Sequence, residues 1–282
     1  MSSGVPRAGA MDLPALSTLN ALLGNPANSA AIECALTAGE FELEERVTFA
    51  IGGALGAARI NDREIVPYRA YTSLAGDRLA IDAIAPGRFM YIAFAGGINC
   101  PVVMGSRSTY VPGRFGGIEG RRLKNGDTLM TVPTSRTRHH VADPLPPALR
   151  PQRRSGPIRF IPRGTPDELT LSEWTLSSSS DRTGYRLAGQ AVIGGASIVS
   201  EPVCPGVIQL PPGGEPIILM ADAPTVGGYR ILGTVIAADI GRLAQLAPGE
   251  PVSFEIVSVE SAQRELIADD ERIAQIREWT LG

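Results

Sequence analysis

Turn-forming residues divide this chain into many short segments, and this division constrains the fold more than any other feature. Glycine occurs 32 times and proline 23 times in 282 residues, and aromatic residues make up only 5%. The segments between these turn residues are mostly short and rich in β-branched side chains, which is typical of strands. The pattern therefore predicts a mainly β protein with a few helices, of the α+β class.

A helix is expected first, since Asp12 can cap it, Pro14 suits its first turn, and Gly24 can end it. Asn61 and Asp62 fit a hairpin turn, and Gly96 with Gly97 fits a corner that needs positive φ. Short apolar runs predict strands at residues 31–36, 46–51, 57–60, 69–74, 79–84, 89–95, 158–162, 207–210, 216–221, 231–237 and 251–259. Further helices are expected at residues 165–174, 239–246 and 261–279, the last with Leu266, Ile273 and Ile276 on its apolar side.

One segment lacks apolar periodicity. Residues 135–157 are rich in arginine and proline, as linkers between domains often are. The chain is also longer than most single domains. We therefore predict an N-terminal lobe at residues 1–134, a linker at 135–157, and a C-terminal lobe with a C-terminal helix at 158–282.

Bulk properties exclude several classes of partner. The formal charge of -3 provides no basic field for nucleic acid or for an anionic membrane surface. Cys34, Cys100 and Cys204 are odd in number and form no CxxC pair, which indicates reduced thiols of a cytosolic protein. The N-terminus shows no signal-peptide pattern, and apolar runs such as residues 89–97 are too short to span a bilayer. We expect a soluble, cytoplasmic protein.

Standard catalytic motifs are missing from the sequence. It contains no phosphate-binding loop of the G-x-x-x-x-G-K type, no G-x-G-x-x-G and no G-x-S-x-G. The two histidines, His139 and His140, are adjacent in the linker and have no further metal ligands at suitable spacing. We interpret them as an exposed polar pair and predict neither a metal site nor a Ser-His-Asp triad.

Residues 105–110 form the first unusual segment. Ser106, Arg107, Ser108 and Tyr110 lie in a glycine-containing loop that leaves a predicted buried strand. Their hydroxyls and guanidinium could clamp a carboxylate or a phosphate. Alternatively, Arg107 satisfies carbonyl groups of the loop.

The second segment, residues 180–187, places Arg182 and Arg186 around a glycine turn, with Asp181 able to orient one of them. An Asp-Arg pair that only holds the turn is the alternative. In the third segment, Gly227 and Gly228 could expose consecutive N–H groups as an anion nest or oxyanion hole, or could form a plain hairpin turn.

The fourth segment is the start of the first predicted helix, where free N–H groups and the helix dipole favour an anion. Asp12 is itself an anion at this position, so capping alone is the other interpretation.

Taken in order, these segments and several other motifs resemble one protein family over nearly the whole chain. The family is the 5-oxoprolinase C subunit, or biotin-dependent carboxyltransferase, and it includes KipA-like proteins and allophanate hydrolase subunit 2. The motifs that carry the resemblance are Val5-Pro6, Gly9-Ala10-Met11-Asp12, Asn20-Ala21-Leu22-Leu23-Gly24-Asn25, Glu33, Ala95-Gly96-Gly97-Ile98, Gly105-Ser106-Arg107-Ser108-Thr109-Tyr110, Ser180-Asp181-Arg182, Gly184-Tyr185-Arg186-Leu187, Pro205-Gly206-Val207-Ile208-Gln209, Pro211, Gly227-Gly228-Tyr229 and Ala238-Asp239. The sequence departs from the family pattern at Arg7, Ala8, Ala223-Pro224-Thr225-Val226 and Arg230.

This resemblance implies two successive cyclophilin-like β-barrel lobes. It implies a hydrolase that opens the lactam of 5-oxoproline to glutamate with ATP, in a heteromeric complex with a KipI-like B subunit and the A subunit of 5-oxoprolinase. Two alternatives come with the same resemblance. One is a KipA-type regulator that binds a KipI-like kinase inhibitor. The other is the carboxyltransferase component of a biotin-dependent urea system, with biotin carried by another protein because this chain has no Met-Lys acceptor pair.

Both reactions build negative charge on an oxygen of an amide or carboxyl carbon, so they require arginines and fixed N–H donors more than a histidine base. We predict that Arg107 and Arg186 hold anionic groups around one shared anion, while Asp12 acts as an acid or base. The remaining predicted site residues are donors, orienting groups or substrate contacts. They are Gly228 and Tyr229 as donors, Asp181 and Gln209 as orienting groups, and Ser106, Ser108, Tyr110, Arg182, Tyr185, Thr225 and Gly227 as contacts.

Overall fold

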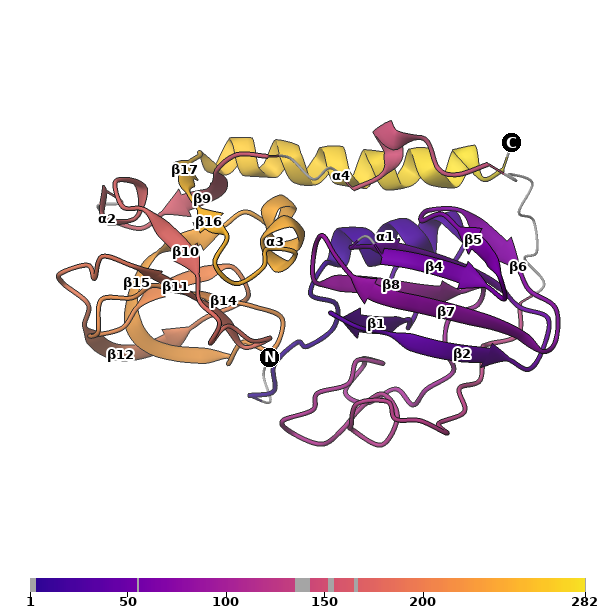
Figure 1. Cartoon of the computed structure of the whole chain (residues 1–282). Coiled ribbons are helices and arrows are strands. Elements are labelled where there is room, and N and C mark those ends of the chain that lie inside the picture. The colour runs from indigo at the N-terminus through magenta and orange to yellow at the C-terminus, as the bar shows by residue number, and fades with distance from the viewer. Residues whose placement is uncertain (1–3, 55, 135–142, 152–154, 165–166, 282) are drawn as a thin grey trace. The chain divides into compact units, whose positions relative to one another are not determined.

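The computed structural model describes residues 4–54, 56–134, 143–151, 155–164 and 167–281, and these residues form a mainly β protein (Figure 1). The predicted fold class is therefore confirmed. The chain divides into two compact units. The N-terminal residues belong to the unit formed by the second half of the sequence, and the C-terminal residues belong to the unit formed by the first half. The barrel unit consists of Met1–Met11 and Arg153–Ile267, and the two-sheet unit consists of Asp12–Gln152 and Ala268–Gly282. In the predicted linker, residues 135–142, which include both histidines, and 152–154 lie outside the described residues.

The two-sheet unit contains helix α1 (Leu13–Leu22) and two four-stranded sheets that share a hydrophobic core. One sheet has the order β1-β8-β3-β6 and the other β2-β7-β4-β5, with antiparallel pairing throughout. The strands are β1 (Ile32–Ala35), β2 (Gly39–Leu43), β3 (Thr48–Gly53), β4 (Gly56–Ile60), β5 (Arg63–Ile65), β6 (Ala70–Thr72), β7 (Asp77–Ile84) and β8 (Phe89–Phe94). Every residue of β8 is buried, because this strand lies in the middle of its sheet.

Helix α1 begins as predicted. The Asp12 carboxylate accepts a hydrogen bond from the Ala15 N–H at 3.1 Å, and a proline occupies the first turn. Asp12 also donates its own N–H to the Tyr91 hydroxyl at 2.8 Å, and this hydroxyl donates to the Glu33 carboxylate at 2.7 Å. Tyr91 is only 1% exposed, so this chain of hydrogen bonds ties the helix start to the centre of β8.

The predicted Asn61-Asp62 hairpin is confirmed: β4 and β5 pair Ile60 with Arg63, and Asn61 has a φ of 52°. Strands β2 and β5 were not predicted from the sequence. Residues 95–134 form no named strand and are held by isolated bridges such as Ile98 with Thr131. In this segment the backbone packs closely, since a Cβ on Gly96 would lie 2.0 Å from the Val132 carbonyl oxygen.

The barrel unit contains a nine-stranded sheet. Eight of its strands follow the order β16-β10-β11-β14-β13-β15-β9-β17, and the ninth, β12, pairs with β15. The two terminal strands, β16 and β17, are separated by Ser253 alone, so the ends of the sheet meet and it forms a nearly closed barrel (Figure 1). The strands are β9 (Ile158–Pro162), β10 (Trp174–Leu176), β11 (Gly184–Gly189), β12 (Ser197–Pro202), β13 (Val207–Leu210), β14 (Ile217–Leu219), β15 (Val226–Val235), β16 (Pro251–Val252) and β17 (Phe254–Ile256). The largest side chains of its core, Trp174, Tyr185 and Phe160, are at most 1% exposed.

Several predictions for this half were wrong. Trp174 begins strand β10 and does not end a helix, because its indole packs in the core and donates to the Leu169 carbonyl at 3.0 Å. Helix α2 covers only Asp167–Thr170, and residues 165–166, where the capping motif was predicted, lie outside the described residues. Gly184 is the first residue of strand β11, and strands β10 to β12 were missed.

Helices α3 (Ala237–Ala244) and α4 (Val259–Trp279) agree with prediction within two residues at each end. On the predicted apolar side of α4, Ile276 is fully buried but Leu266 is 50% exposed. Helix α4 begins in the barrel unit, and its part from Ala268 onward belongs to the two-sheet unit. A short 3-10 helix, η1 (Pro147–Leu149), lies in the predicted linker.

The three cysteines form no disulfide in the described structure, and Cys34 and Cys100 are buried. Burial, assisted by the neighbouring negative charge of Glu33, raises the pKa of the Cys34 thiol to about 12. This thiol is therefore protonated and unreactive at neutral pH. Among the helices that the structure describes, none combines the length and the apolar character that crossing a membrane requires.

We predict that Tyr91→Phe destabilises the protein by about 1–3 kcal/mol, because the phenyl ring keeps the packing but leaves buried polar groups without the hydroxyl. Urea denaturation monitored by circular dichroism measures the change. The matched control is Tyr71→Phe, which removes a hydroxyl that accepts the Val66 N–H at 2.8 Å in an exposed position and should cost less. Equal losses for both variants would contradict the role given to Tyr91.

Candidate functional site

In the two-sheet unit, the loop of residues 105–110 bonds largely to itself. Arg107 donates from Nη1 to the Cys100 carbonyl, and Cys100 contacts the Arg107 carbonyl through Sγ at 3.6 Å. The Ser106 hydroxyl donates to Ser108 Oγ at 2.9 Å and accepts the Ser108 N–H at 3.1 Å. One side of the guanidinium therefore satisfies a loop carbonyl, which is the structural alternative of the two predicted from the sequence.

The aromatic and acidic residues predicted for this unit also have structural contacts. The Tyr110 ring lies 5.5 Å from that of Phe115. Asp12 is 6% exposed, and its carboxylate already caps α1. An external anion at this helix start would meet a negative charge there. The capping interpretation of Asp12 is thus supported, and its role as an acid or base stays a prediction.

In the barrel unit, Asp181 and Arg182 do not pair as expected. The Asp181 carboxylate closes its own turn by accepting the N–H groups of Thr183 at 2.8 Å and Gly184 at 3.2 Å. Arg182 instead makes a two-point contact with Asp222, with both distances 3.0 Å, and donates to the Gly9 carbonyl at 2.6 Å. Asp222 is 6% exposed and was missed by sequence reasoning, although it is a lone acidic residue after an apolar run.

Strand register brings two other predicted residues together. Arg186 of β11 lies opposite Ile217 of β14, and Ile217 lies opposite Gln209 of β13. Residues directly opposite each other in an antiparallel sheet project from the same face. Arg186, Ile217 and Gln209 therefore form a row on the outer face of the barrel sheet, and we call them the Arg186–Gln209 row.

The opposite face of the same strands is the barrel core. Tyr185 is fully buried there and donates its hydroxyl to the Ala244 carbonyl at 2.8 Å. Ile208 and Ile218 are likewise completely buried. Tyr185 thus faces away from the row, so a direct contact of its side chain with a ligand on the row is ruled out.

Both polar members of the row have side-chain groups without a partner among the described residues. Arg186 is exposed, and its guanidinium makes no hydrogen bond or ion pair with any residue that the structure describes. Gln209 is 4% exposed, and its buried Nε2 has no hydrogen-bond partner among the described residues. A buried amide without a partner is unusual in native proteins and calls for a functional explanation.

Gly227 lies directly over this amide. A Cβ on Gly227 would come within 2.2 Å of Gln209 Nε2, so only glycine permits the observed approach. Gly227 and Gly228 lie inside strand β15, and neither has a positive φ. The predicted turn and the predicted nest of consecutive N–H groups are both wrong, because N–H groups alternate in direction along a strand.

The last two residues of this group lie beside Gly227. The Thr225 carbonyl accepts the Val203 N–H at 3.1 Å, and Tyr229, opposite Ser197 of β12, is 39% exposed. These residues thus come from one sheet of the barrel unit, with Gln209 on β13, Gly227, Gly228 and Tyr229 on β15, and Arg186 on β11. Arg107 and Asp12 belong to the two-sheet unit, and the shared anion stays a prediction.

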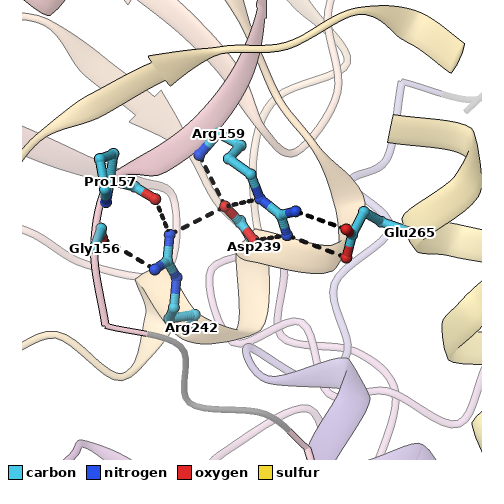
Figure 2. Close-up of polar contacts among 6 residues, drawn as sticks. All are labelled: Gly156, Pro157, Arg159, Asp239, Arg242 and Glu265. Atoms are coloured by element: carbon cyan, nitrogen blue, oxygen red, sulfur yellow. Dashed lines mark hydrogen bonds and ion pairs between the residues drawn. The ribbon is translucent and has the colours of Figure 1, made fainter. Parts of the chain in front are cut away.

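Asp239, another residue of the recognised motifs, organises a buried ionic network (Figure 2). Its carboxylate, 3% exposed, accepts the Arg159 backbone N–H at 2.8 Å and the Arg159 side chain at 2.8 and 3.2 Å. Arg159 also pairs with Glu265 of α4 at 2.9 Å. Arg242 pairs with Asp239 at 3.1 Å and donates to the carbonyls of Gly156 and Pro157.

This network joins the strand β9, the helix α3 and the start of α4, so its role is structural. Burial alone would raise the pKa of the Asp239 carboxyl. Hydrogen bonds from the Arg159 side chain and backbone, with the charges of Arg242 and Arg159, outweigh burial and hold the pKa below its ordinary value of 3.8. No local sequence signal pointed to Arg159, which lies 80 positions from Asp239.

In chemical terms, the side chains of the Arg186–Gln209 row are those that bind an anion and an amide. Among the described residues, no group of three or more His, Cys, Asp or Glu side chains could hold a metal ion. The row combines a solvent-exposed positive charge, an apolar side chain and an amide. We take it as the candidate site of the barrel unit.

Comparison with known proteins points to one family. The carboxyltransferase domain, subdomains A and B, matches residues 3–256. The C subunit of 5-oxoprolinase from Escherichia coli (strain K12) is 38% identical over 99% of this chain and 91% of that protein. Its counterpart from Haemophilus influenzae, also a 5-oxoprolinase C subunit, is 36% identical over 97% of this chain and 90% of that protein. The crystal structure of Kluyveromyces lactis urea carboxylase superimposes with a TM-score of 0.87 at 25% identity, over 99% of this chain and 27% of that one.

We predict that Asp239→Asn lowers the free energy of unfolding at pH 7 by about 3–5 kcal/mol, because it removes the buried negative charge that Arg159 and Arg242 share. The folded-state pKa of Asp239 is depressed, so its stabilising effect is complete above the ordinary value of 3.8 and disappears as the pH falls through the folded pKa. Urea denaturation at a series of pH values should show the two proteins converging at the acidic end.

The control for this experiment is Asp82→Asn. Asp82 pairs with Arg59 at 3.3 Å, but both side chains are more than 40% exposed, so the expected loss is small at every pH. A pH-independent difference between wild type and Asp239→Asn would rule out the ionic role of Asp239.

Proposed function

We propose that this chain, which belongs to the carboxyltransferase domain family, is the C subunit of an ATP-dependent 5-oxoprolinase that hydrolyses 5-oxoproline to glutamate. The observation that carries the proposal is sequence identity to two 5-oxoprolinase C subunits. The identities are 38% and 36%, and each match covers nearly the whole of this chain and at least 90% of the matched protein. The urea carboxylase match is lower in identity and spans only a part of a much longer chain.

The candidate site suits this chemistry. Opening a lactam moves negative charge onto the carbonyl oxygen, and the substrate brings a carboxylate of its own. The unpaired guanidinium of Arg186 provides a fixed positive charge for the carboxylate, while the Gln209 amide can pair with the lactam. The residues of this chain thus bind and orient the substrate, and we assign them no proton transfer.

ATP does not fit the starts of helices α1, α3 and α4. Phosphate binds at helix N-termini through free N–H groups and the helix dipole. Here α1 begins with Asp12, and the first turns of α3 and α4 contain Asp239 and Glu260. These carboxylates repel a phosphate. We therefore assign the nucleotide to another protein of the complex, in which the A subunit and a KipI-like B subunit complete the enzyme in the cytoplasm.

A second candidate function is carboxyl transfer in a biotin-dependent system that acts on urea. The family description and the TM-score of 0.87 to urea carboxylase favour it. Carboxyl transfer also develops charge on a carboxyl oxygen, so an arginine and an amide would serve it as well. Urea carries no carboxylate, so in this reaction the group held by Arg186 would be the carboxyl group that is transferred.

The test is to purify the full chain together with its A and B partners and to measure glutamate release from 5-oxoproline. We expect release that requires ATP, 5-oxoproline and all three proteins, since the reaction is shared between them. Mixtures that omit this chain are the control.

Release of glutamate without this chain would remove it from the reaction. A stable complex with the B partner that shows no turnover when all three proteins are present would favour a regulatory role. Carboxylation of urea with a biotinylated carrier protein, without activity on 5-oxoproline, would favour the carboxyltransferase.

A further inference from the structure

We infer that the loop between Ile98 and Thr131, in the two-sheet unit, is a docking surface for the acidic face of another protein subunit. We call it the 98–131 loop. An isolated bridge between Ile98 and Thr131 joins its two ends, and the loop lies wholly within this unit. The inference rests on the proposed function in one respect, namely that the chain works as one subunit of a complex.

The length of the 98–131 loop is the first sign of a function. All of its residues are described, and none belongs to a named helix or strand (Figure 1). Loops of more than about 15 residues without secondary structure are uncommon in compact domains and are usually either functional or disordered. This loop bonds to itself, since Val103 and Ser106 exchange backbone hydrogen bonds at 2.8 and 3.0 Å and Arg121 pairs with Asp127 at 2.7 Å. Its length therefore indicates a function.

Close packing of glycines gives the loop a fixed shape. A Cβ on Gly116 would lie 2.1 Å from the Ser108 carbonyl oxygen, and one on Gly120 would lie 2.3 Å from the Arg114 carbonyl oxygen. Met104 and Arg114 themselves have positive φ values of 50° and 56°, a strained conformation for residues with a side chain. A surface that is already fixed loses little conformational freedom when a partner binds to it.

This fixed loop presents large apolar side chains to solvent. Five of them are between 39% and 62% exposed, namely Val102, Met104, Val111, Leu123 and Met130. Single exposed apolar residues are normal on a protein surface, but several on one loop indicate an interaction site. Methionine and arginine are also enriched in protein–protein interfaces.

Positive charge accompanies these apolar side chains. The 98–131 loop contains five of the 26 Lys and Arg residues of the chain but only two of its 29 Asp and Glu residues. Its net charge is therefore +3, whereas the rest of the chain carries −6. Both acidic residues, Glu119 and Asp127, already pair with Arg121. Three exposed side chains make no hydrogen bond or ion pair with any residue that the structure describes: Arg114, Arg122 and Lys124.

These properties favour an acidic protein surface with apolar pockets as the occupant. Single-stranded nucleic acid stacks its bases on aromatic side chains, whereas the exposed apolar residues of this loop are aliphatic. A second copy of the chain fits less well, because contact between two such loops brings like charges together. A loop on the acidic face of another copy is a head-to-tail contact, which produces rings or open filaments. In the proposed function the chain has two partner proteins, so we assign the loop to one of these.

Lys124 makes a local test possible, because it is the only lysine of the chain. An amine-specific acetylating reagent therefore modifies one side chain of the loop, and mass spectrometry measures the rate. We expect Lys124 of the full chain to react at least about tenfold more slowly in complex with its A and B partners than alone, since a docked surface excludes solvent. The control is Arg63→Lys, which adds an amine on the exposed strand β5 and should react equally fast in both samples.

Two sets of variants separate the charged and apolar parts of the surface. Arg114→Glu combined with Arg122→Glu should raise the Kd for the protecting partner about 10- to 100-fold and reduce its dependence on salt. The control is Arg46→Glu combined with Arg63→Glu, at exposed positions of the same unit outside the loop.

Met104→Asn should raise the same Kd about tenfold without changing the salt dependence, because asparagine tolerates the positive φ but removes the apolar contact. Its control is Leu171→Asn in the barrel unit, at a side chain that is 83% exposed. All altered side chains are exposed, so the thermal midpoints should match that of wild type.

Turnover of 5-oxoproline by a complex in which Lys124 reacts as fast as in the free chain overturns the inference and leaves the proposed function intact. Protection of Lys124 by a partner without turnover supports the inference while the proposed function fails. Equal slowing at Lys124 and at the Arg63→Lys amine overturns the assignment to this loop. So does the absence of a complex with either partner, or protection of Lys124 by self-association of the full chain or by an added nucleic acid.

Discussion

Closure of the barrel sheet is the constraint on which the candidate site depends. Strands β16 and β17 lie at opposite ends of the sheet order, but only Ser253 separates them in the chain. The Ser253 carbonyl also accepts the Ile158 N–H at 2.7 Å, which fixes β17 beside β9. A sheet joined to itself in this way cannot slip by one residue without turning core side chains outward. The register that places Arg186 and Gln209 on one outer face is therefore locked by the fold.

The polar groups of the barrel unit separate into two kinds when their partners are compared. Asp239, Arg159, Arg242 and Glu265 are matched charges at element boundaries, and their mutual hydrogen bonds offset the cost of burial. Gln209 has a buried donor that the described structure leaves unmatched. A fold selected only for stability would replace it with an apolar residue. This unmatched donor, on the same sheet face as the unpaired Arg186, is our reason to assign the row a binding function and not only a packing function.

Local sequence signals predicted the elements whose boundaries are chemically marked. The cap of Asp12, the Asn61 hairpin and the strand β13 (Val207–Leu210) all appear where the residues indicate. Strand β11 was missed because Gly184, which usually marks a turn, begins it and pairs with Leu219 of β14. Trp174 was assigned to a helix because its pairing with Gly189 and Val252 comes from distant parts of the chain. Tertiary pairing overrides local propensity at these positions.

The same limit applies to the site, and two neighbouring arginines show why. Arg182 and Arg186 belong to one motif and have the same chemistry, so the sequence cannot rank them. The structure separates them because Asp222, 40 positions from Arg182, lies within reach of that arginine, while β11 carries Arg186 outward on the face opposite Tyr185. A guanidinium already bound to a buried carboxylate has little attraction left for a ligand, whereas an unpaired one keeps its full charge. Whether an arginine can bind a ligand thus depends on whether another side chain of the protein already pairs with it. That pairing is visible in the three-dimensional structure and not in the sequence.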